Sequence, residues 1–244
     1  MKKEKIIIAN WKMNFLFKDA KKLLNIILKK RKALKHNLII CPSTSIISSV
    51  KKFVGNKVLL GAQNCHYENS GPFTGDDSPS VLKDIGCKYV IIGHSERRTA
   101  YFESNELIKK KIQSANKKGL NAIICIGESL STKKQKKTET FLSKQLNDSL
   151  PKEKINKGII IAYEPIWSIG TGVTPKIDEI SKLHSFIKKT IVKISPKYKN
   201  VKILYGGSVS EKNAKNFLSC NEVDGFLLGG ASLKSKTLLS ILSI

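Results

Sequence analysis

Eight short apolar runs alternate along the chain with longer amphipathic segments, and this alternation restricts the possible folds more than any other feature. Each run has four or five residues and is rich in Ile, Val and Leu, which favours strands that are buried on both faces. The runs are Lys5–Ala9, Leu38–Cys41, Val58–Ala62, Tyr89–Ile92, Ala122–Ile126, Ile159–Tyr163, Val201–Tyr205 and Gly225–Leu228.

The segments between the runs are rich in lysine and carry Leu and Ile at helical spacing, as in Ala20–Leu28, Glu106–Lys118, Phe141–Leu150 and Ile177–Ile194. Strands that alternate with helices predict parallel βαβ units. Eight such units within 244 residues predict a closed (β/α)8 TIM barrel, with eight parallel strands ringed by helices. A doubly wound open sheet is the alternative, but the first turn lacks the Gly-x-Gly-x-x-Gly pattern that is typical of it. Because no linker or composition shift interrupts the pattern, we predict one domain over residues 1–244.

The charge balance of the chain is strongly basic, with 44 Lys and Arg against 19 Asp and Glu, a formal net charge of +25. Such a charge attracts anionic ligands and favours nonspecific contact with nucleic acid. The lysines, however, are scattered through every expected helix, and the densest cluster, Lys133–Lys137, has no aromatic residues interleaved with it. We therefore interpret the charge as solvated helix faces and expect no nucleic-acid partner.

The cysteine and histidine patterns bear on location and metal binding. Five cysteines without a Cys-x-x-Cys pair predict buried thiols in a reducing compartment. The four histidines lack the spacing of metal ligands, so we expect no metal. The first apolar run is too short for a signal peptide and no run could span a bilayer. We therefore expect a cytoplasmic protein without a membrane partner.

Polar and glycine residues follow the predicted strands where their carboxyl ends would meet on one face of a barrel, which is where such barrels bind ligands. Asn10 and Lys12 follow the first run, His94 and Glu96 the fourth, and Glu164 the sixth. Paired glycines follow the last two runs, at 206–207 and 229–230. We expect each pair to precede a helix, so that its backbone N–H groups can hold a phosphate at the positive end of the helix dipole.

Glu164 is open to two interpretations when it is taken alone. It could merely end a strand ahead of a surface loop, or it could be a general base beneath a lid. The cation and imidazole expected on the same face favour the base. A carboxylate, an imidazole and a fixed cation suit proton abstraction next to a carbonyl group. The paired glycines add a phosphate site, so the predicted substrates are small phosphorylated carbonyl compounds.

Seven motifs carry a resemblance to a known family, in order and over nearly the whole chain. They are Ala9-Asn10-Trp11-Lys12-Met13-Asn14, Gly61-Ala62-Gln63-Asn64-Cys65, Ile92-Gly93-His94-Ser95-Glu96-Arg97-Arg98, Cys125-Ile126-Gly127-Glu128, Tyr163-Glu164-Pro165-Ile166-Trp167 with Ile169-Gly170-Thr171-Gly172, Tyr205-Gly206-Gly207-Ser208, and Leu228-Gly229-Gly230-Ala231-Ser232. With these motifs the sequence resembles the triosephosphate isomerase family. The resemblance implies interconversion of dihydroxyacetone phosphate and D-glyceraldehyde 3-phosphate through an enediol(ate), without a cofactor, as a step of glycolysis and gluconeogenesis.

The resemblance also implies roles for the residues at the strand ends. Glu164 would be the base, and His94 would be the neutral imidazole that polarises the carbonyl, a pairing known from this family rather than established by these residues alone. Lys12 would supply positive charge and Asn10 a hydrogen bond to the substrate. Glu96 would either take part in catalysis directly or serve as a structural partner of the lysine or of nearby arginines.

A lid and a phosphate site follow from the same resemblance. The implied lid contains Pro165, Ile166, Trp167, Gly170, Thr171 and Gly172, and it would be bonded when shut by Tyr205 and Ser208. Its closure would press Ile169 and Leu227 toward Glu164 and raise the pKa of that carboxyl by removing water. Phosphate would be held by the backbone N–H groups of Gly170, Ser208, Gly229 and Gly230.

The resemblance further implies a homodimer through the loop of residues 64–78, whose tip carries Phe73, Thr74 and Gly75; Thr74 would enter the partner near Asn10 and Lys12. Several residues depart from the family pattern. In the loop these are Asp76 where Glu is usual, Asp77 where an aliphatic residue is usual, and Pro72 in place of the commoner Ala. In the lid, Ser168 replaces Ala, and Val173-Thr174-Pro175 replaces the frequent Lys-Thr-Ala of the far hinge. Asp76 is one methylene shorter for any pairing with Arg97. We expect Ser168 and Pro175 to alter the opening of the lid without altering the chemistry.

Two other functions are compatible with parts of the pattern. Another phosphate-binding barrel isomerase would keep the paired glycines, but it need not combine Lys12, His94 and Glu164. A basic nucleic-acid-binding protein would explain the net charge, but it predicts a localised basic stripe that the sequence does not contain.

Overall fold

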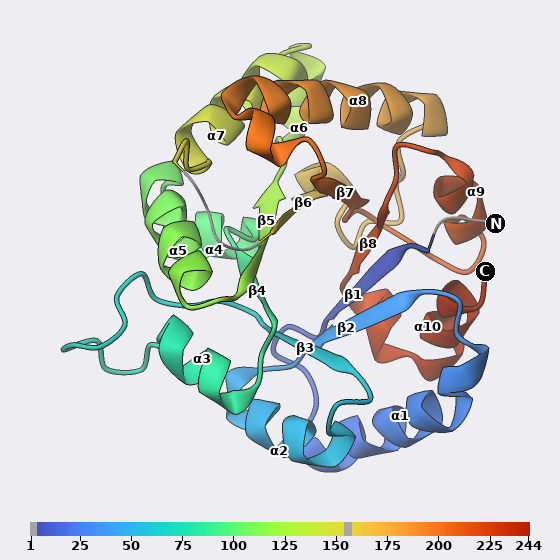
Figure 1. The fold of residues 1–244 in the computed structure, drawn as a ribbon. Helices are drawn as coiled ribbons and strands as arrows, with labels where there is room; N and C mark the ends of the chain where they lie inside the picture. The colour runs from blue at the N-terminus through green and yellow to red at the C-terminus, as the bar shows by residue number, and fades with distance from the viewer. Residues whose placement is uncertain (1–3, 154–157) are drawn as a thin grey trace.

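Eight parallel strands close into a barrel in the structure, a computed structural model that describes residues 4–153 and 158–244 (Figure 1). Each strand pairs in parallel with the next, and β8 pairs with β1. The predicted (β/α)8 barrel is therefore confirmed. The strands are β1 Ile6–Asn10, β2 Asn37–Cys41, β3 Leu59–Ala62, β4 Tyr89–Ile92, β5 Asn121–Ile126, β6 Ile159–Tyr163, β7 Lys202–Tyr205 and β8 Gly225–Leu228.

Helices surround the barrel and cover the outward faces of its strands (Figure 1). The four predicted helical segments coincide within a few residues with α1, α5, α7 and α8. Serine hydroxyls cap the first turns of α3, α5 and α6, which satisfies backbone N–H groups that have no partner inside the helix. The α-helices are α1 Phe17–Lys30, α2 Thr44–Val54, α3 Pro79–Ile85, α4 Ser95–Ala100, α5 Asn105–Lys117, α6 Leu130–Lys134, α7 Thr138–Ser149, α8 Ile177–Ile194, α9 Ala214–Ser219 and α10 Ser235–Leu242, and the 3₁₀ turns are η1 Arg31–Ala33, η2 Ile166–Ser168, η3 Pro196–Tyr198 and η4 Gly230–Leu233.

The strands bury apolar side chains on both faces, which explains why their sequences read as continuous apolar runs. Alternate residues such as Ile123 and Cys125 of β5 fill the inside of the barrel, while Ala122 and Ile124 pack outward against the helices. Inside the barrel lie Ile8, Ile39, Cys41, Ile91, Ile123, Cys125, Ile160, Ala162, Leu204 and Leu227. Because this interior is filled, the barrel is a packed core that holds the strand ends in fixed positions.

The predicted burial of the thiols is confirmed, since all five cysteines are free and buried. In the two described stretches, 4–153 and 158–244, no helix has the length and apolar character that crossing a membrane requires.

Closure of the barrel depends on a glycine at the start of β8. Gly225 has φ +148°, and a Cβ at this position would lie 1.8 Å from the carbonyl oxygen of Ile6. Because that oxygen belongs to the backbone of β1, it cannot move away as a flexible side chain could. The two strands can therefore pair here only when residue 225 has no side chain.

We expect Gly225→Ala to reduce the free energy of unfolding by about 3 kcal/mol or more, because the new methyl group separates β8 from β1. Gly55→Ala is the control: Gly55 also has a positive φ, but a Cβ there meets no atom within 4 Å, so the cost is backbone strain alone, about 1–3 kcal/mol, without the clash. Thermal unfolding followed by circular dichroism measures both. Equal losses in the two variants would contradict this account of closure.

Candidate active site

The carboxyl end of β1 places Lys12 in the candidate site through an unusual backbone conformation. Lys12 has φ +52°, and Asn10 stabilises the turn, because its Oδ1 accepts a hydrogen bond of 3.1 Å from the Lys12 N–H. Gln63 donates from Nε2 to the carbonyl oxygens of Lys12 and Cys41, at 2.8 and 2.9 Å. The Lys12 ammonium group then reaches Glu96, with Nζ 2.6 Å from Oε1.

The end of β4 fixes the orientation of the His94 ring. His94 is the N-cap residue of α4, and its Nδ1 accepts a hydrogen bond of 3.2 Å from the Glu96 N–H. A ring nitrogen that accepts carries no hydrogen, so this bond assigns the hydrogen of the neutral ring to Nε2. Nε2 lies 3.2 Å from Oε1 of Glu164, and the ring can therefore donate to that carboxylate.

The end of β6 seats Glu164 between two glycines. A Cβ on Gly127 would lie 1.8 Å from the Glu164 carbonyl oxygen, and a Cβ on Gly206 would lie 2.6 Å from its Cγ. Glu164 is 3% exposed. Its Oε2 is buried and has no hydrogen-bond partner within residues 4–153 and 158–244. A buried carboxylate oxygen without a partner is costly to stability, and such groups mark functional sites.

Opposing effects set the pKa values of this pair. Burial raises the pKa of Glu164, but the nearby imidazole, the Cys125 thiol and Lys12 together hold it below its ordinary value. Burial lowers the pKa of His94, but the two carboxylates of Glu164 and Glu96 raise it above its ordinary value. The hydrogen bond that Nδ1 accepts from the Glu96 N–H opposes protonation of Nδ1. The geometry is therefore compatible with a neutral His94 ring.

One cavity of about 310 Å³ gathers most of the predicted site residues. It lies at the carboxyl ends of the strands, as expected for a barrel of this type. Glu96 is the exception: its side chain is 56% exposed and lines a neighbouring cavity of about 480 Å³ that also contacts Asn10, Lys12 and His94. The first cavity is lined by Asn10, Lys12, His94, Glu164, Ile169, Gly170, Ser208, Leu227, Gly229 and Gly230, among others.

The segment after Glu164 lies against this cavity and is bonded to both neighbouring strands. On the β5 side, Glu128 accepts a hydrogen bond of 2.8 Å from the indole N–H of Trp167, and its carbonyl oxygen accepts one of 3.1 Å from the Ile166 N–H. On the β7 side, Oγ of Ser208 accepts from the Gly172 N–H at 3.2 Å. Glycines at 170 and 172, both with positive φ, let the backbone turn between these two attachments.

Comparison with known proteins identifies the family. The sequence profile of the triosephosphate isomerase family matches residues 5–244. The chain belongs to the triosephosphate isomerase family. This confirms the resemblance found in the seven motifs, and with it the enzyme class, an isomerase.

Individual members of the triosephosphate isomerase family are similar over nearly their whole length. The triosephosphate isomerase of Bartonella henselae is 41% identical over 98% of this chain and 95% of its own. That of Dictyoglomus thermophilum is 41% identical over 98% of both chains. A crystal structure of the Bartonella henselae enzyme superimposes with a TM-score of 0.88 and 38% identity, covering 98% of this chain and 97% of the other.

Several residues that build the site were not singled out from the sequence. Glu128 holds the segment after Glu164 and also accepts a hydrogen bond from the Tyr163 hydroxyl at 3.1 Å, although the motif that contains it was noted. Gln63 supports the turn at Lys12. Cys125, interpreted as a core residue, lies in the barrel interior and also contacts the Glu164 carboxylate. Each of these contacts joins different strands, so spacing along the chain could not predict it.

The prediction that each paired glycine precedes a helix is wrong for one pair. After Gly229 the 3₁₀ turn η4 begins at once, at Gly230. After Gly206 and Gly207 the next helix, α9, begins only at Ala214. The chain bends around the cavity between these points, so no helix N-terminus follows directly from the turn at β7.

The long loop of residues 64–78 projects from the barrel between β3 and α3 (Figure 1). Its tip folds back on its base, with the rings of Phe73 and His66 4.0 Å apart. Oδ2 of Asp76 lies 3.9 Å from Nε2 of His66. Arg97 pairs instead with Glu103, with Nε 2.6 Å from Oε1.

We expect the Glu164 carboxyl to be still ionised at a pH equal to the ordinary pKa of a glutamate, and to take up its proton only at lower pH. The reason is that His94 stabilises the charged form. Its contribution to stability is therefore present above the ordinary pKa and is lost as pH falls through the folded-state pKa. In His94→Gln, burial dominates and the titration moves to higher pH. Carboxyl ¹³C NMR, assigned with Glu164→Gln, measures both.

The control for this titration is His66→Gln, which removes an imidazole that does not contact Glu164. It should leave the Glu164 titration where it is in the unaltered protein. A Glu164 carboxyl that titrates at the same pH with and without His94 would contradict the proposed coupling.

Proposed function

We propose that this chain interconverts dihydroxyacetone phosphate and D-glyceraldehyde 3-phosphate, with Glu164 as the base. The contact between Glu164 and His94 carries the proposal: two titratable groups lie 3.2 Å apart and are almost completely buried, beside a cation and a glycine-lined cavity. One group can remove a proton from carbon while the other donates a hydrogen bond to oxygen, which is what isomerisation through an enediol(ate) requires.

The proton transfers can be assigned to named atoms. A carboxylate oxygen of Glu164 takes the proton from the carbon next to the carbonyl, and returns it to the neighbouring carbon. Nε2–H of His94 donates to the carbonyl oxygen and stabilises the negative charge that develops there. Lys12, at the rim of the same cavity, adds positive charge. General base catalysis contributes about 10²–10⁴-fold, so stabilisation of the oxyanion by the other two residues supplies much of the remainder.

Of the two roles left open for Glu96, its position favours the structural one. Its carboxylate holds Nζ of Lys12 at 2.6 Å, and its backbone N–H fixes the ring of His94. Its side chain lines the neighbouring cavity rather than the one that contains Glu164. We therefore propose Glu96 as a positioning residue for the lysine and the imidazole.

The phosphate of the substrate fits the part of the cavity opposite the carboxylate, where Gly170, Ser208, Gly229 and Gly230 line the wall. Backbone N–H groups there can bind an anion without an arginine. The 3₁₀ turn η4 begins at Gly230 and presents its N-terminal N–H groups on this side. A Cβ on Gly229 would approach Lys12 Cε to 3.3 Å, so the missing side chain keeps the lysine close to the phosphate site.

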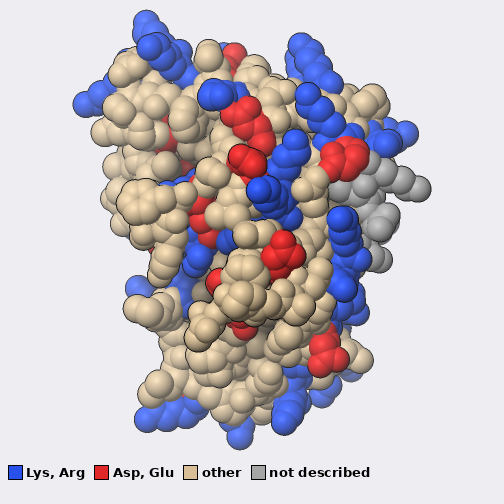
Figure 2. All heavy atoms as spheres, turned by 90° about the vertical axis from the view of Figure 1, so that its left-hand side faces the viewer, with Lys and Arg blue, Asp and Glu red and all other residues tan. Residues whose placement is uncertain are grey.

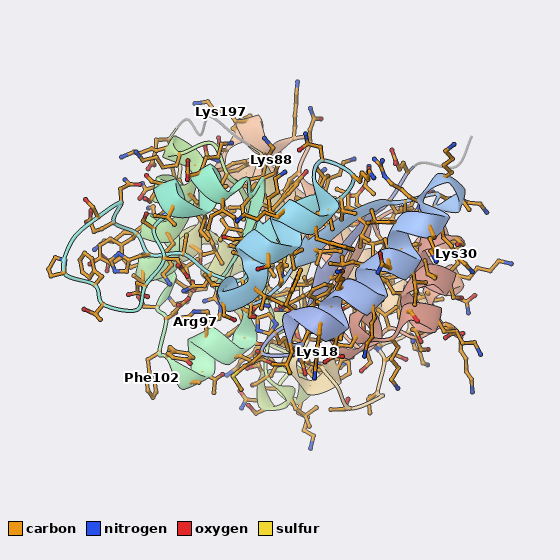
Figure 3. All side chains as sticks on the ribbon, turned by 90° about the horizontal axis from the view of Figure 1, so that it is seen from below. Lys18, Lys30, Lys88, Arg97, Phe102 and Lys197 are labelled. Carbon is orange, nitrogen blue, oxygen red and sulfur yellow. The ribbon has the colours of Figure 1, made fainter. Side chains whose placement is uncertain are left out.

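We further propose a homodimer formed through the loop of residues 64–78. Large apolar side chains are exposed on the same side of the molecule, including Met13 at 95%, Tyr101 at 66% and Phe102 at 85%. Figure 3 shows Phe102 projecting outward after α4, on the side where the long loop lies. The cavity of about 480 Å³ beside Lys12 has the place and size to receive Thr74 of a second copy.

A cytoplasmic location and the absence of a cofactor stay predictions from the sequence, as does a single domain over residues 1–244.

The alternative of nucleic-acid binding gains no support from the face of the molecule that Figure 2 shows. Figure 2 shows Lys and Arg side chains spread over one face with Asp and Glu between them. In Figure 3, Lys18 and Lys30 lie apart from each other and from Lys88 and Lys197.

We expect Glu164→Gln to reduce the isomerisation rate by about 10²–10⁴-fold, because the amide cannot accept the proton. Glu139→Gln is the matched control: Glu139 is exposed at the start of α7, and its loss should leave the rate unchanged. The measurement is a coupled assay for conversion of D-glyceraldehyde 3-phosphate to dihydroxyacetone phosphate. No activity in the unaltered protein, or full activity in Glu164→Gln, would refute the proposed function.

The proposed dimer predicts a particle of twice 27.1 kDa in size-exclusion chromatography with light scattering. Phe102→Ser should shift it toward the monomer, because it removes a large apolar contact from the interface. Phe141→Ser changes a phenylalanine that is also exposed, at 39%, but on α7, and should leave the dimer intact. A monomeric unaltered protein would rule out this assembly.

A further inference from the structure

The hydroxyl of Ser168 makes a full set of hydrogen bonds in a completely buried position. Ser168 is 0% exposed. Its Oγ donates to the Val173 carbonyl oxygen at 2.6 Å, which uses its only hydrogen. The Tyr205 hydroxyl at 3.0 Å must therefore donate to Oγ, as the Ser208 N–H does at 3.3 Å. One hydrogen donated and two accepted is all that a hydroxyl can form.

These bonds connect the two ends of the lid segment. Ser168 ends η2, and Val173 lies beyond the residues of the segment that line the cavity, Ile169, Gly170 and Gly172. A second serine doubles the connection, because Oγ of Ser208 donates to the Ser168 carbonyl oxygen at 2.5 Å and accepts from Gly172. The lid is thereby closed into a short loop and attached to the end of β7.

The surroundings leave room for this arrangement. A Cβ on Gly207 would lie 2.2 Å from the Tyr205 hydroxyl oxygen and 2.7 Å from Oγ of Ser168. The absence of a side chain at residue 207 therefore lets the two hydroxyls meet. Ser168 itself does not line the cavity, so it acts on the site only through the lid.

We propose that Ser168 is a positioning residue whose hydroxyl holds the lid over the active site by tying both lid ends to Tyr205 and Ser208. The inference rests on the proposed function, in which the lid covers an enediolate. With alanine at this position, Tyr205 loses an acceptor and the Val173 carbonyl loses a donor, and both groups belong to the shut arrangement. A net contribution of about 0.5–1.5 kcal/mol for each bond raises the ratio of open to shut lid about 2- to 13-fold for each bond lost, and about 5-fold or more for the two together.

The lid has a chemical consequence that can be measured apart from isomerisation. When the enediolate of a triose phosphate is exposed to water, the electron pair on its oxygen re-forms a carbonyl and the carbon–carbon double bond shifts toward the carbon that bears the phosphate. The carbon–oxygen bond to phosphate breaks, and inorganic phosphate leaves with the bonding electrons. The enol that remains takes up a proton at its terminal carbon, releases its hydroxyl proton to water and becomes methylglyoxal. A looser lid therefore releases more phosphate for each isomerisation.

The test compares Ser168→Ala with Ser48→Ala, an exposed serine of α2 that serves as the control. Fluorotryptophan reports on the lid through ¹⁹F NMR, since the chain has two tryptophans and Trp11→Phe leaves only Trp167. Lid exchange and phosphate release per isomerisation should each rise about 5-fold or more in Ser168→Ala, and KM should change more than kcat. Unchanged lid exchange and phosphate release in a folded Ser168→Ala protein would overturn the proposal.

A double-mutant cycle with Tyr205→Phe tests the route of the effect. If the two hydroxyls act through their shared bond, Ser168→Ala adds little to lid exchange once Tyr205→Phe is present. Effects that multiply in full would overturn the shared bond. The ¹⁹F measurement, made with and without 2-phosphoglycolate as the anionic probe, needs no turnover. Absent isomerase activity would therefore refute the proposed function, whereas unchanged lid exchange would refute the role of Ser168.

Discussion

The contact of Glu164 with His94 depends on backbone that carries no side chain. Gly127 follows β5 and Gly206 follows β7, and a Cβ on either would occupy space that Glu164 fills. The carboxylate is therefore seated by the strands on both sides of β6, while the ring comes from β4. These four strands, β4 to β7, are consecutive neighbours in the sheet. Lys12 follows β1, and the pairing of β1 with β8 that closes the barrel brings it to the same cavity. That closure depends in turn on another glycine, Gly225, at the opposite end of the barrel.

Burial and the neighbouring charges act in opposite directions on the pKa of Glu164. Removing a carboxylate from water disfavours its charged form, yet the pKa of Glu164 lies below its ordinary value because the imidazole and Lys12 stabilise the charge. The expectation that burial beneath the lid raises this pKa is therefore not met in this structure. Burial does act in that direction, but the imidazole, the Cys125 thiol and Lys12 together outweigh it.

The barrel could be predicted from the sequence because each strand is recognisable from its own residues alone. A run buried on both faces is readable from four or five residues, and all eight observed strands lie within two residues of the predicted runs. Long helices such as α8 were equally readable from their periodicity. Short helices such as α4 and α6 were not, because five or six residues hold too few turns to show a period. Their positions are set by caps and by contacts with other strands.

The site was predicted less evenly, for the same reason. Lys12, His94 and Glu164 were named because each lies within two residues of the end of a strand, and the fold brings all three to one cavity. The supports of these residues, Gln63 and Glu128, act across strands, and nothing in their spacing indicates which group they hold. The paired glycines after β7 show the opposite error: their sequence suggested a helix N-terminus, whereas the chain bends past the cavity before α9 begins.

The proposed lid depends on contacts of the same kind, because hydrogen bonds to residues from two different strands hold it in place. Its first end is held by Glu128 from β5, and its second by Ser208 from β7, so it is attached on both sides of the strand that bears the base. A segment attached only at β5 could swing aside while keeping all its bonds. The attachment at β7 must break for the lid to open, and Oγ of Ser168 makes two of its hydrogen bonds, to Tyr205 and Ser208, besides the bond to Val173 within the lid. The strength of this single junction therefore sets the balance between access of substrate and exclusion of water.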